Sequence, residues 1–392
     1  MTPSIYLDHN ATTTQLPEVA DAVRHAALRY SANPESQHEL GRRARRVLED
    51  ARERIGFLLG VRMGGVAADR VVFTSGGTEA NNLALLGLTA SPGGGSNSPG
   101  HLVVSAIEHP SVLEAAKQLE LQGWKVDRAR ADRDGVVGLQ QFERLLTAET
   151  RLVSQMLGNN ETGVLQPVAK LAAACAARGI LVHTDAAQVV GKLPVCFAEL
   201  NVAALCFTAH KFHGPVGIGV LLLRGDVHLE PLLFGGHQQA GVRPGTESVA
   251  LAVGMRTALE CWHREAAARQ RRMAELRDHF EQTLTAELPE TAVIGGRSER
   301  LPNTSNISFV GFDRQALLMA LDLAGVACST GSACASGSSE PSPVLVAMGL
   351  EQATVEGSIR FSLGASTTAQ DVAAGVQHIL SACKRIRRGS NG

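Results

Sequence analysis

Between residues 70 and 224 the chain alternates short apolar runs with longer segments whose apolar residues recur at helical spacing. The short runs predict β-strands at RVVFTS (70–75), HLVVSAIEH (101–109), WKVDRAR (124–130), RLVSQML (151–157), GILVHTDAAQ (179–188), VAALCFTA (202–209) and GPVGIGVLLLR (214–224). The segments between them predict helices, among them one over 139–148. Strands separated by helices are typical of a mostly parallel α/β sheet covered on both faces. Polar residues gather where these strands end, and ligands bind at that edge in such sheets.

Further elements are predicted on both sides of this region. Helices are expected at 17–30, 38–59 and, over a long stretch rich in Ala, Arg, Glu and Leu, at 249–288; strands near 303–310 and 358–364 and helices near 313–324 and 369–383 follow. The later pattern is that of a smaller α+β unit. We therefore predict a large domain over residues 15–255, and a small C-terminal domain formed by residues 1–14 and 256–392.

The composition narrows the classes of protein. With 392 residues, 44% hydrophobic and 19% charged, the chain is large enough for two cores. Its net charge of −1 gives no general attraction to nucleic acid or a membrane, so neither is an expected partner. No apolar run has spanning length, the N-terminus lacks the features of a signal peptide, and the seven scattered cysteines suit reduced thiols. A cytoplasmic location is expected.

Lys211 and Asp185 are the first candidates for chemistry. Lys211 lies in TAHKFHGPVGIG, where a turn enters a buried strand, and a partly desolvated amine there can form a Schiff base with an aldehyde such as pyridoxal 5′-phosphate (PLP). Asp185 ends an apolar strand, where its carboxylate needs a positive partner such as a pyridinium nitrogen. A surface lysine at a strand edge and a turn-capping aspartate are the alternatives.

Two further segments suit the same ligand. Ser75-Gly76-Gly77-Thr78 joins a strand to a helix, so backbone N–H groups and a hydroxyl at the helix N-terminus are suited to a phosphate, although a plain turn with a capping threonine has the same sequence. His109 follows another strand, where an imidazole can stack on a flat ring or move protons; a capping or core histidine is the alternative.

The segment ACSTGSACASGSSEPSPVL, residues 327–345, is too rich in Gly, Ser and Ala to pack a core. We expect Cys334 to be an exposed thiol in a mobile loop and interpret it as a nucleophile. A redox pair with Cys328, or half of a metal site, is the alternative, but CxxC spacing and nearby ligands are missing. No metal is predicted.

Taken together, these motifs resemble the cysteine desulfurases of the class-V aminotransferase group, which are PLP enzymes of fold type I. The resemblance runs in order through YLDHNATT (6–13), FTSGGTEANN (73–82), EHPSV (108–112), NNETGVLQP (159–167), HTDAAQ (183–188), HKFHGPVGIG (210–219), RPGTES (243–248), GSACASGSSEPSPVL (331–345) and RFSLG (360–364). It therefore covers nearly the whole chain.

The resemblance implies a role for each site residue. Lys211 would bind PLP, Asp185 would pair with its ring nitrogen, and His109 would stack on the ring and assist proton transfer. Gln188 would contact the ring oxygen, Asn160 the ring substituents, and Gly77, Thr78, Thr208, His210 and, from the second subunit of a homodimer, Thr246 the phosphate. Arg360 and Asn33 would hold the carboxylate of L-cysteine. Cys334 would attack the substrate sulfur, leaving alanine and an enzyme persulfide.

The persulfide would then pass to a sulfur-acceptor protein for iron–sulfur cluster assembly or tRNA thiolation. Selenocysteine lyase, another class-V transferase and a catalytically silent scaffold are the rivals; none of them gives Cys334 and its loop this task. The chain departs from the family at Gln239 and Ala240, where Glu and Arg are expected, and at Ala365, where a larger residue is common.

Overall fold

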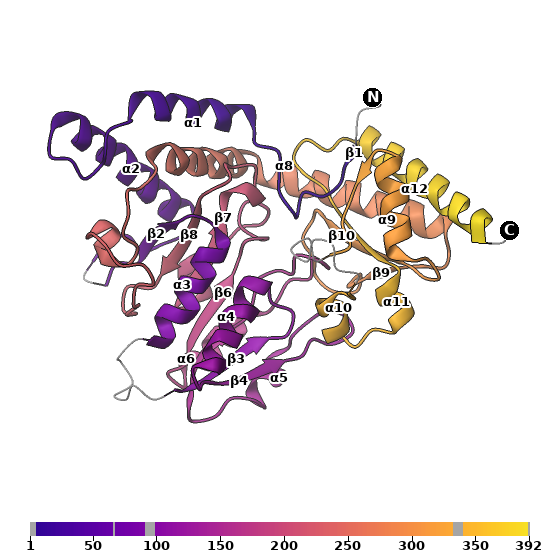
Figure 1. Cartoon of the computed structure of the whole chain (residues 1–392), viewed down its shortest axis with the longest axis horizontal. Helices are drawn as coiled ribbons and strands as arrows, with labels where there is room; N and C mark the ends of the chain where they lie inside the picture. The colour runs from indigo at the N-terminus through magenta and orange to yellow at the C-terminus, as the bar shows by residue number, and fades with distance from the viewer. Residues whose placement is uncertain (1–4, 66, 91–98, 332–339, 391–392) are drawn as a thin grey trace.

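A computed structural model describes residues 5–65, 67–90, 99–331 and 340–390, and side chains up to residue 387. The chain folds into a large α/β part and a smaller α+β part that lie side by side and are joined by one long helix (Figure 1). The predicted α/β fold with a mostly parallel seven-stranded sheet is confirmed.

The large sheet has the strand order β2-β8-β7-β6-β5-β3-β4. Its strands are β2 (Arg70–Thr74), β3 (His101–Ser105), β4 (Lys125–Ala129), β5 (Thr150–Ser154), β6 (Leu181–Asp185), β7 (Ala204–Thr208) and β8 (Gly219–Leu223). β8 alone runs antiparallel to both of its neighbours. Because β8 follows β7 after a short turn, it returns along the same sheet without a crossover helix.

Helices cover the two faces of this sheet. α3 (Gly77–Ala90) and α4 (Pro110–Leu121) pack on one face, where their apolar residues share a core with residues such as Leu102 and Leu221. The other face packs against α2 (Glu39–Leu58), α6 (Val168–Ala176) and the first part of α8 (Val249–Glu287). α1 (Pro17–Arg29) lies along α8, and the short α5 (Leu139–Glu143) and α7 (Phe197–Leu200) complete this part.

The smaller part is built on an antiparallel sheet of order β12-β10-β9, made by β9 (Thr291–Ile294), β10 (Thr304–Phe309) and β12 (Ser358–Ser362). Its separate core includes α9 (Arg314–Leu323), α12 (Ala369–Ser390) and the end of α8. The N-terminal strand β1 (Ile5–Tyr6) pairs in parallel with β11 (Val326–Ala327) and joins that core. The helices α10 (Pro343–Ala347) and α11 (Gln352–Glu356) also belong to the smaller part, but their buried residues pack into the core of the large part.

The structure refines two of the element predictions. The helix expected over 139–148 ends at Glu143, and the small domain contains β9, β11, α10 and α11, which the sequence pattern did not single out. Within the described residues, every helix is too short or too polar to cross a bilayer.

Candidate active site

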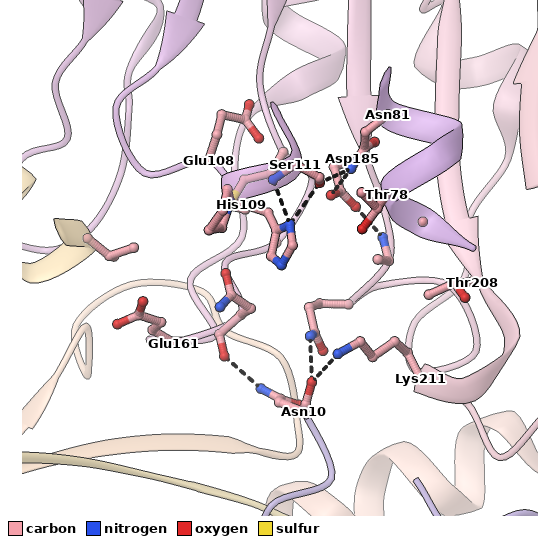
Figure 2. A pocket seen from close by; sticks show the side chains of 18 of the residues that line it. Asn10, Thr78, Asn81, Glu108, His109, Ser111, Glu161, Asp185, Thr208 and Lys211 are labelled. Atoms are coloured by element: carbon pink, nitrogen blue, oxygen red, sulfur yellow. Dashed lines mark hydrogen bonds between the residues drawn. The ribbon is translucent and has the colours of Figure 1, made fainter. Parts of the chain in front are cut away.

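A cavity of about 290 Å³ opens where the carboxyl ends of the central strands meet the smaller domain. The large domain supplies most of its wall, and Gly331, Pro343, Val344 and Arg360 close it from the other side. Figure 2 shows side chains from several separate segments converging on this space. Ten of the predicted site residues line it, namely Gly77, Thr78, His109, Asn160, Asp185, Gln188, Thr208, His210, Lys211 and Arg360.

Lys211 and Asp185 reach this cavity from neighbouring strands. Asp185 is the last residue of β6 and pairs in register with Cys206 of β7, whose end leads directly into the turn Ala209–Lys211. The Lys211 amine donates hydrogen bonds to the backbone carbonyls of Asn10 (2.6 Å) and Ala11 (2.7 Å). The N-terminal segment therefore supplies a resting position for the lysine.

The Asp185 carboxylate is 6% exposed and is held by neutral donors. Its Oδ2 accepts from Asn81 Nδ2 at 2.7 Å, and its Oδ1 accepts from the Ala187 backbone N–H at 2.8 Å. Among the described residues no lysine, arginine or histidine forms an ion pair with it. A buried carboxylate of this kind needs a positive group from a ligand, as the pyridinium of PLP would supply.

Asn81 links Asp185 to His109, and the sequence alone assigned it no role. Its Nδ2 also donates to Ser111 Oγ at 2.9 Å, and Ser111 Oγ lies 2.7 Å from His109 Nδ1 (Figure 2). His109 caps α4 by accepting from the Ser111 backbone N–H at 3.1 Å. Because Nδ1 accepts that bond, the proton of the neutral ring is on Nε2.

A buried acid, Glu108, lies near Asp185 and directly precedes His109 in the chain. Glu108 is 2% exposed and lines the cavity, Ser154 Oγ donates to its Oε1 at 3.2 Å, and its Oε2 has no hydrogen-bond partner. Burial, and then the nearby Asp185 charge, raise the pKa of Glu108 to about 8. Glu108 is therefore protonated at neutral pH, which leaves Asp185 as the nearby anion.

The predicted phosphate-binding segment, Ser75-Gly76-Gly77-Thr78, lies at the start of α3. The first N–H groups of a helix lack partners inside it, and Gly77 and Thr78 begin α3 at the cavity wall. The turn approaches β8 so closely that a Cβ on Gly219 would lie 2.5 Å from the Gly76 backbone. Thr208 Oγ1 donates to the Ile218 carbonyl at 2.9 Å. Burial, and then the Lys211 and Lys192 charges, lower the pKa of His210 to about 4, so its ring is neutral.

Arg360, on β12, is fully buried and crosses from the smaller domain into the cavity. Its guanidinium pairs with Asp8 Oδ1 at 2.6 Å and donates to the carbonyls of Asn160 (3.1 Å) and Gly331 (3.0 Å). Its Nε has no hydrogen-bond partner. A buried cationic N–H without an acceptor beside a cavity suits a carboxylate ligand.

Two more residues of this region were missed by sequence reasoning. The Asn10 side chain donates to the Asn160 carbonyl (3.1 Å) and Thr304 Oγ1 (2.9 Å), and so connects both domains. Lys192 is 4% exposed and donates to Gln188 Oε1 at 2.6 Å and Asn10 Oδ1 at 3.0 Å. The available signal was a lysine in the otherwise apolar stretch VVGKLPV, four residues after Gln188.

Two predicted residues, Asn33 and Thr246, do not line the cavity. Cys334 lies outside the described residues. Asn33 is exposed, and its Oδ1 accepts from the Glu35 backbone N–H, while Thr246 is exposed on the segment that precedes α8. No group of three or more potential metal-ligand side chains gathers anywhere in the described ranges.

The residues at which this chain departs from the family pattern, Gln239, Ala240 and Ala365, have local structural roles. Gln239 has a left-handed backbone (φ 53°), and its amide pairs with both the N–H and the carbonyl of Phe73 on the edge strand β2, at 2.6 and 2.8 Å. A glutamate could accept from that N–H but could not donate to the carbonyl. Ala240 is also left-handed (φ 56°), and Ala365 donates its N–H to His213 Nε2 at 3.1 Å.

The donor set as a whole fits PLP. An uncompensated carboxylate, a lysine on the neighbouring strand, an imidazole and a helix N-terminus all border one cavity, and its volume is close to the lower limit for small-molecule sites.

Comparisons with known proteins agree with this fit. The sequence profile of the family "Aminotransferase class-V" matches residues 5–374. A cysteine desulfurase of Trichormus azollae is 41% identical over 386 residues, which cover 98% of this chain and 94% of the relative. The cysteine desulfurase IscS of Dictyoglomus turgidum is 40% identical, over 95% and 92% of the two chains.

Solved structures give the same result. A NifS-like protein superposes with a TM-score of 0.89 at 32% identity and covers 97% of this chain and 99% of its own. A structure described as SspA in complex with cysteine has a TM-score of 0.79 at 30% identity, over 93% of this chain and 100% of its own.

Proposed function

Because the chain belongs to the class-V aminotransferase family, and within it to the PLP-dependent cysteine desulfurases, we propose which side chains perform each part of the reaction. The substrate is L-cysteine, and the products are alanine and sulfur bound to the enzyme as a persulfide. PLP, when bound, supplies an electron sink that makes the bonds at the substrate Cα labile. The protein supplies orientation, charge and proton transfer.

Lys211 and Asp185 hold the cofactor from two sides. The lysine amine is the point of covalent attachment, and it is released to the carbonyls of Asn10 and Ala11 when it is not attached. Asp185, with its two neutral donors, keeps a negative charge ready for the ring nitrogen. Gln188 would contact the ring oxygen, and Asn160 the ring substituents; both line the cavity.

His109 would stack on the PLP ring and would move protons through Nε2, because its Nδ1 is occupied by Ser111. The N-terminus of α3, with Gly77 and Thr78, binds the phosphate together with Thr208 and His210. The neutral state of His210 lets it donate one N–H without adding a charge.

Arg360 binds the substrate carboxylate, and its unpartnered Nε supports this role. Asn33 is the second residue that the resemblance assigns to this contact, although it does not line the cavity of this chain. Cys334 then attacks the substrate sulfur as a thiolate: an S–S bond forms, the Cβ–S bond breaks, and its electron pair stays with the carbon fragment, which takes up a proton to become alanine. The persulfide is delivered to an acceptor protein for iron–sulfur cluster assembly or tRNA thiolation.

We also propose that the enzyme is a cytoplasmic homodimer in which Thr246 reaches the phosphate of the partner subunit. Two observations support the dimer: Thr246 is exposed, and Phe234, on the same segment, is 90% exposed although it is a large apolar side chain. Light scattering of the purified protein tests the mass. A monomer with undiminished cofactor binding would contradict the role of Thr246.

The observation that carries this proposal is the pairing of Asp185 and Lys211 at the ends of two adjacent parallel strands beside one cavity. Purified protein should be yellow, and Lys211→Ala should lose both the visible absorbance and sulfide release from L-cysteine. A colourless protein that takes up no added PLP would reject the cofactor assignment.

Cys334→Ala should keep the absorbance but lose sulfide release, because only the sulfur acceptor is removed. Cys328→Ala is the matched control: burial raises the pKa of the Cys328 thiol to about 12, so it is inert at neutral pH and its loss should leave the rate unchanged. Equal losses in both variants would favour a redox pair over a single nucleophile.

A further inference from the structure

Lys192 is a buried lysine beside the site, and the proposed reaction gives it no task. It follows Gly191, whose left-handed backbone (φ 76°) lets the chain pass Phe212 so closely that a Cβ there would lie 2.2 Å from the Phe212 Cβ. This approach brings Lys192 next to the residue that follows Lys211 in the chain. No carboxylate in the described parts of the chain lies within ion-pair distance of the Lys192 amine.

The charges around Lys192 are positive or neutral. The titratable groups that act on it or feel its charge are Lys211, Arg360, His9, His210 and His213. Burial, followed by the charges of Lys211 and Arg360, places the pKa of Lys192 well below its ordinary value. The structure gives the Lys192 amine two acceptors, Gln188 Oε1 at 2.6 Å and Asn10 Oδ1 at 3.0 Å.

These two bonds fix the direction of the Gln188 amide. Since Oε1 is occupied by Lys192, the Nε2 end must face the other way, and one of its hydrogens is donated to the Asn10 carbonyl at 3.0 Å. The same carbonyl accepts from Lys211 at 2.6 Å. Gln188 lines the cavity, so its second Nε2 hydrogen is available to a ligand there.

We propose that Lys192 is a positioning residue that holds Gln188 as a hydrogen-bond donor toward the ring oxygen of PLP and so sets the protonation equilibrium of the bound cofactor. This inference rests on the proposed function, because it places PLP in the cavity and Gln188 at its ring oxygen. Lys192 itself touches neither cofactor nor substrate; it acts through Gln188 and Asn10.

The test is a pH titration of the visible absorbance of the purified holoenzyme, without substrate. Lys192→Met removes the two donors and retains the length and apolar body of the side chain. A donor to the ring oxygen stabilises its anionic form, so losing it favours the protonated cofactor. The midpoint should rise by about one pH unit, the size expected for one hydrogen bond to a charged group.

A double-mutant comparison separates positioning from simple charge removal. Gln188→Leu should shift the midpoint by a similar amount, and Lys192→Met added to it should produce no further shift, because both changes remove the same donor. Additive shifts would overturn the proposal. Lys192→Gln, which keeps a donor amide, should recover part of the shift, and Lys170→Met, at an exposed lysine of α6, should cause none.

The outcomes separate a failure of the proposed function from a failure of the role of Lys192. A wild-type protein without cofactor absorbance would reject the proposed function itself. A wild-type protein that titrates, with an unchanged midpoint in Lys192→Met, would reject only the role of Lys192. Loss of PLP binding in both folded Lys192 variants but not in Gln188→Leu would also overturn the proposal, because the effect would not then pass through Gln188.

Discussion

Asn10→Ala should destabilise the protein far more than a typical substitution in a polar segment. The Asn10 side chain makes four hydrogen bonds, donating to the Asn160 carbonyl and Thr304 Oγ1 and accepting from Lys192 and Asn303 at 3.0 and 3.1 Å. Each partner keeps another hydrogen bond, Asn303 for example with the Leu363 carbonyl. The net cost per bond is therefore near the usual 0.5–1.5 kcal/mol, and the sum is about 2–6 kcal/mol.

The assay is denaturant unfolding of the apoprotein, followed by tryptophan fluorescence and by circular dichroism. The chain has two tryptophans, Trp124 beside β4 and Trp262 in α8, so fluorescence reports on the core under α3 and α4 and on the helix that joins the two domains. Thr304→Val is the graded control, because it retains shape and removes only one of the four contacts with Asn10. It should cost a fraction of the loss in Asn10→Ala.

The main-chain carbonyl of residue 10 is unaffected by the substitution, so Lys211 keeps its resting acceptor and the variant should still bind PLP. A loss of unfolding free energy below about 1 kcal/mol, or a loss no larger than that of Thr304→Val, would refute the idea that Asn10 joins the two domains.

Two further predictions concern stability. Glu108→Gln should become more stable relative to the wild type as pH rises from about 4.5 to 8, because the folded wild type keeps a proton that the unfolded chain releases. The gain in unfolding free energy should reach a few kcal/mol, since each pH unit between the folded and unfolded pKa values contributes about 1.4 kcal/mol. Parallel pH profiles of the denaturation midpoints of the two apoproteins would contradict this prediction. Ala240→Gly should stabilise the protein by about 1 kcal/mol, because glycine adopts the left-handed backbone without strain, and an unchanged thermal midpoint would contradict this.

The sequence predicted the large sheet well because its strands are short, apolar and separated by regular helices. β7, for instance, is buried at every residue, and its short apolar run predicts a buried strand. The antiparallel direction of β8 depends on how it pairs with β7 and β2, which no local pattern records. α5 ends at Glu143, because residues 144–148 form turns and loop. The helix propensity of these residues led to the prediction of a longer helix.

For the site, chemistry that belongs to a single side chain was visible in the sequence, and chemistry that depends on partners was not. Asp185 and Lys211 stand out because charged residues are costly at the ends of buried strands. Asn81 and Asn10 are ordinary polar residues in sequence, and their importance comes from contacts with residues 104 and 294 positions away. Lys192 needed the structure to show both its burial and its acceptors.

The continuous helix α8 limits how the two domains can move. At about 1.5 Å per residue its 39 residues extend for about 58 Å, along α1 and α2 at one end and beside β9, β10 and α12 at the other. A rotation of one domain against the other would have to bend this helix and break its internal hydrogen bonds. α8 therefore ties the two domains together, and a hinge motion between them would have to pass through a bend in this helix.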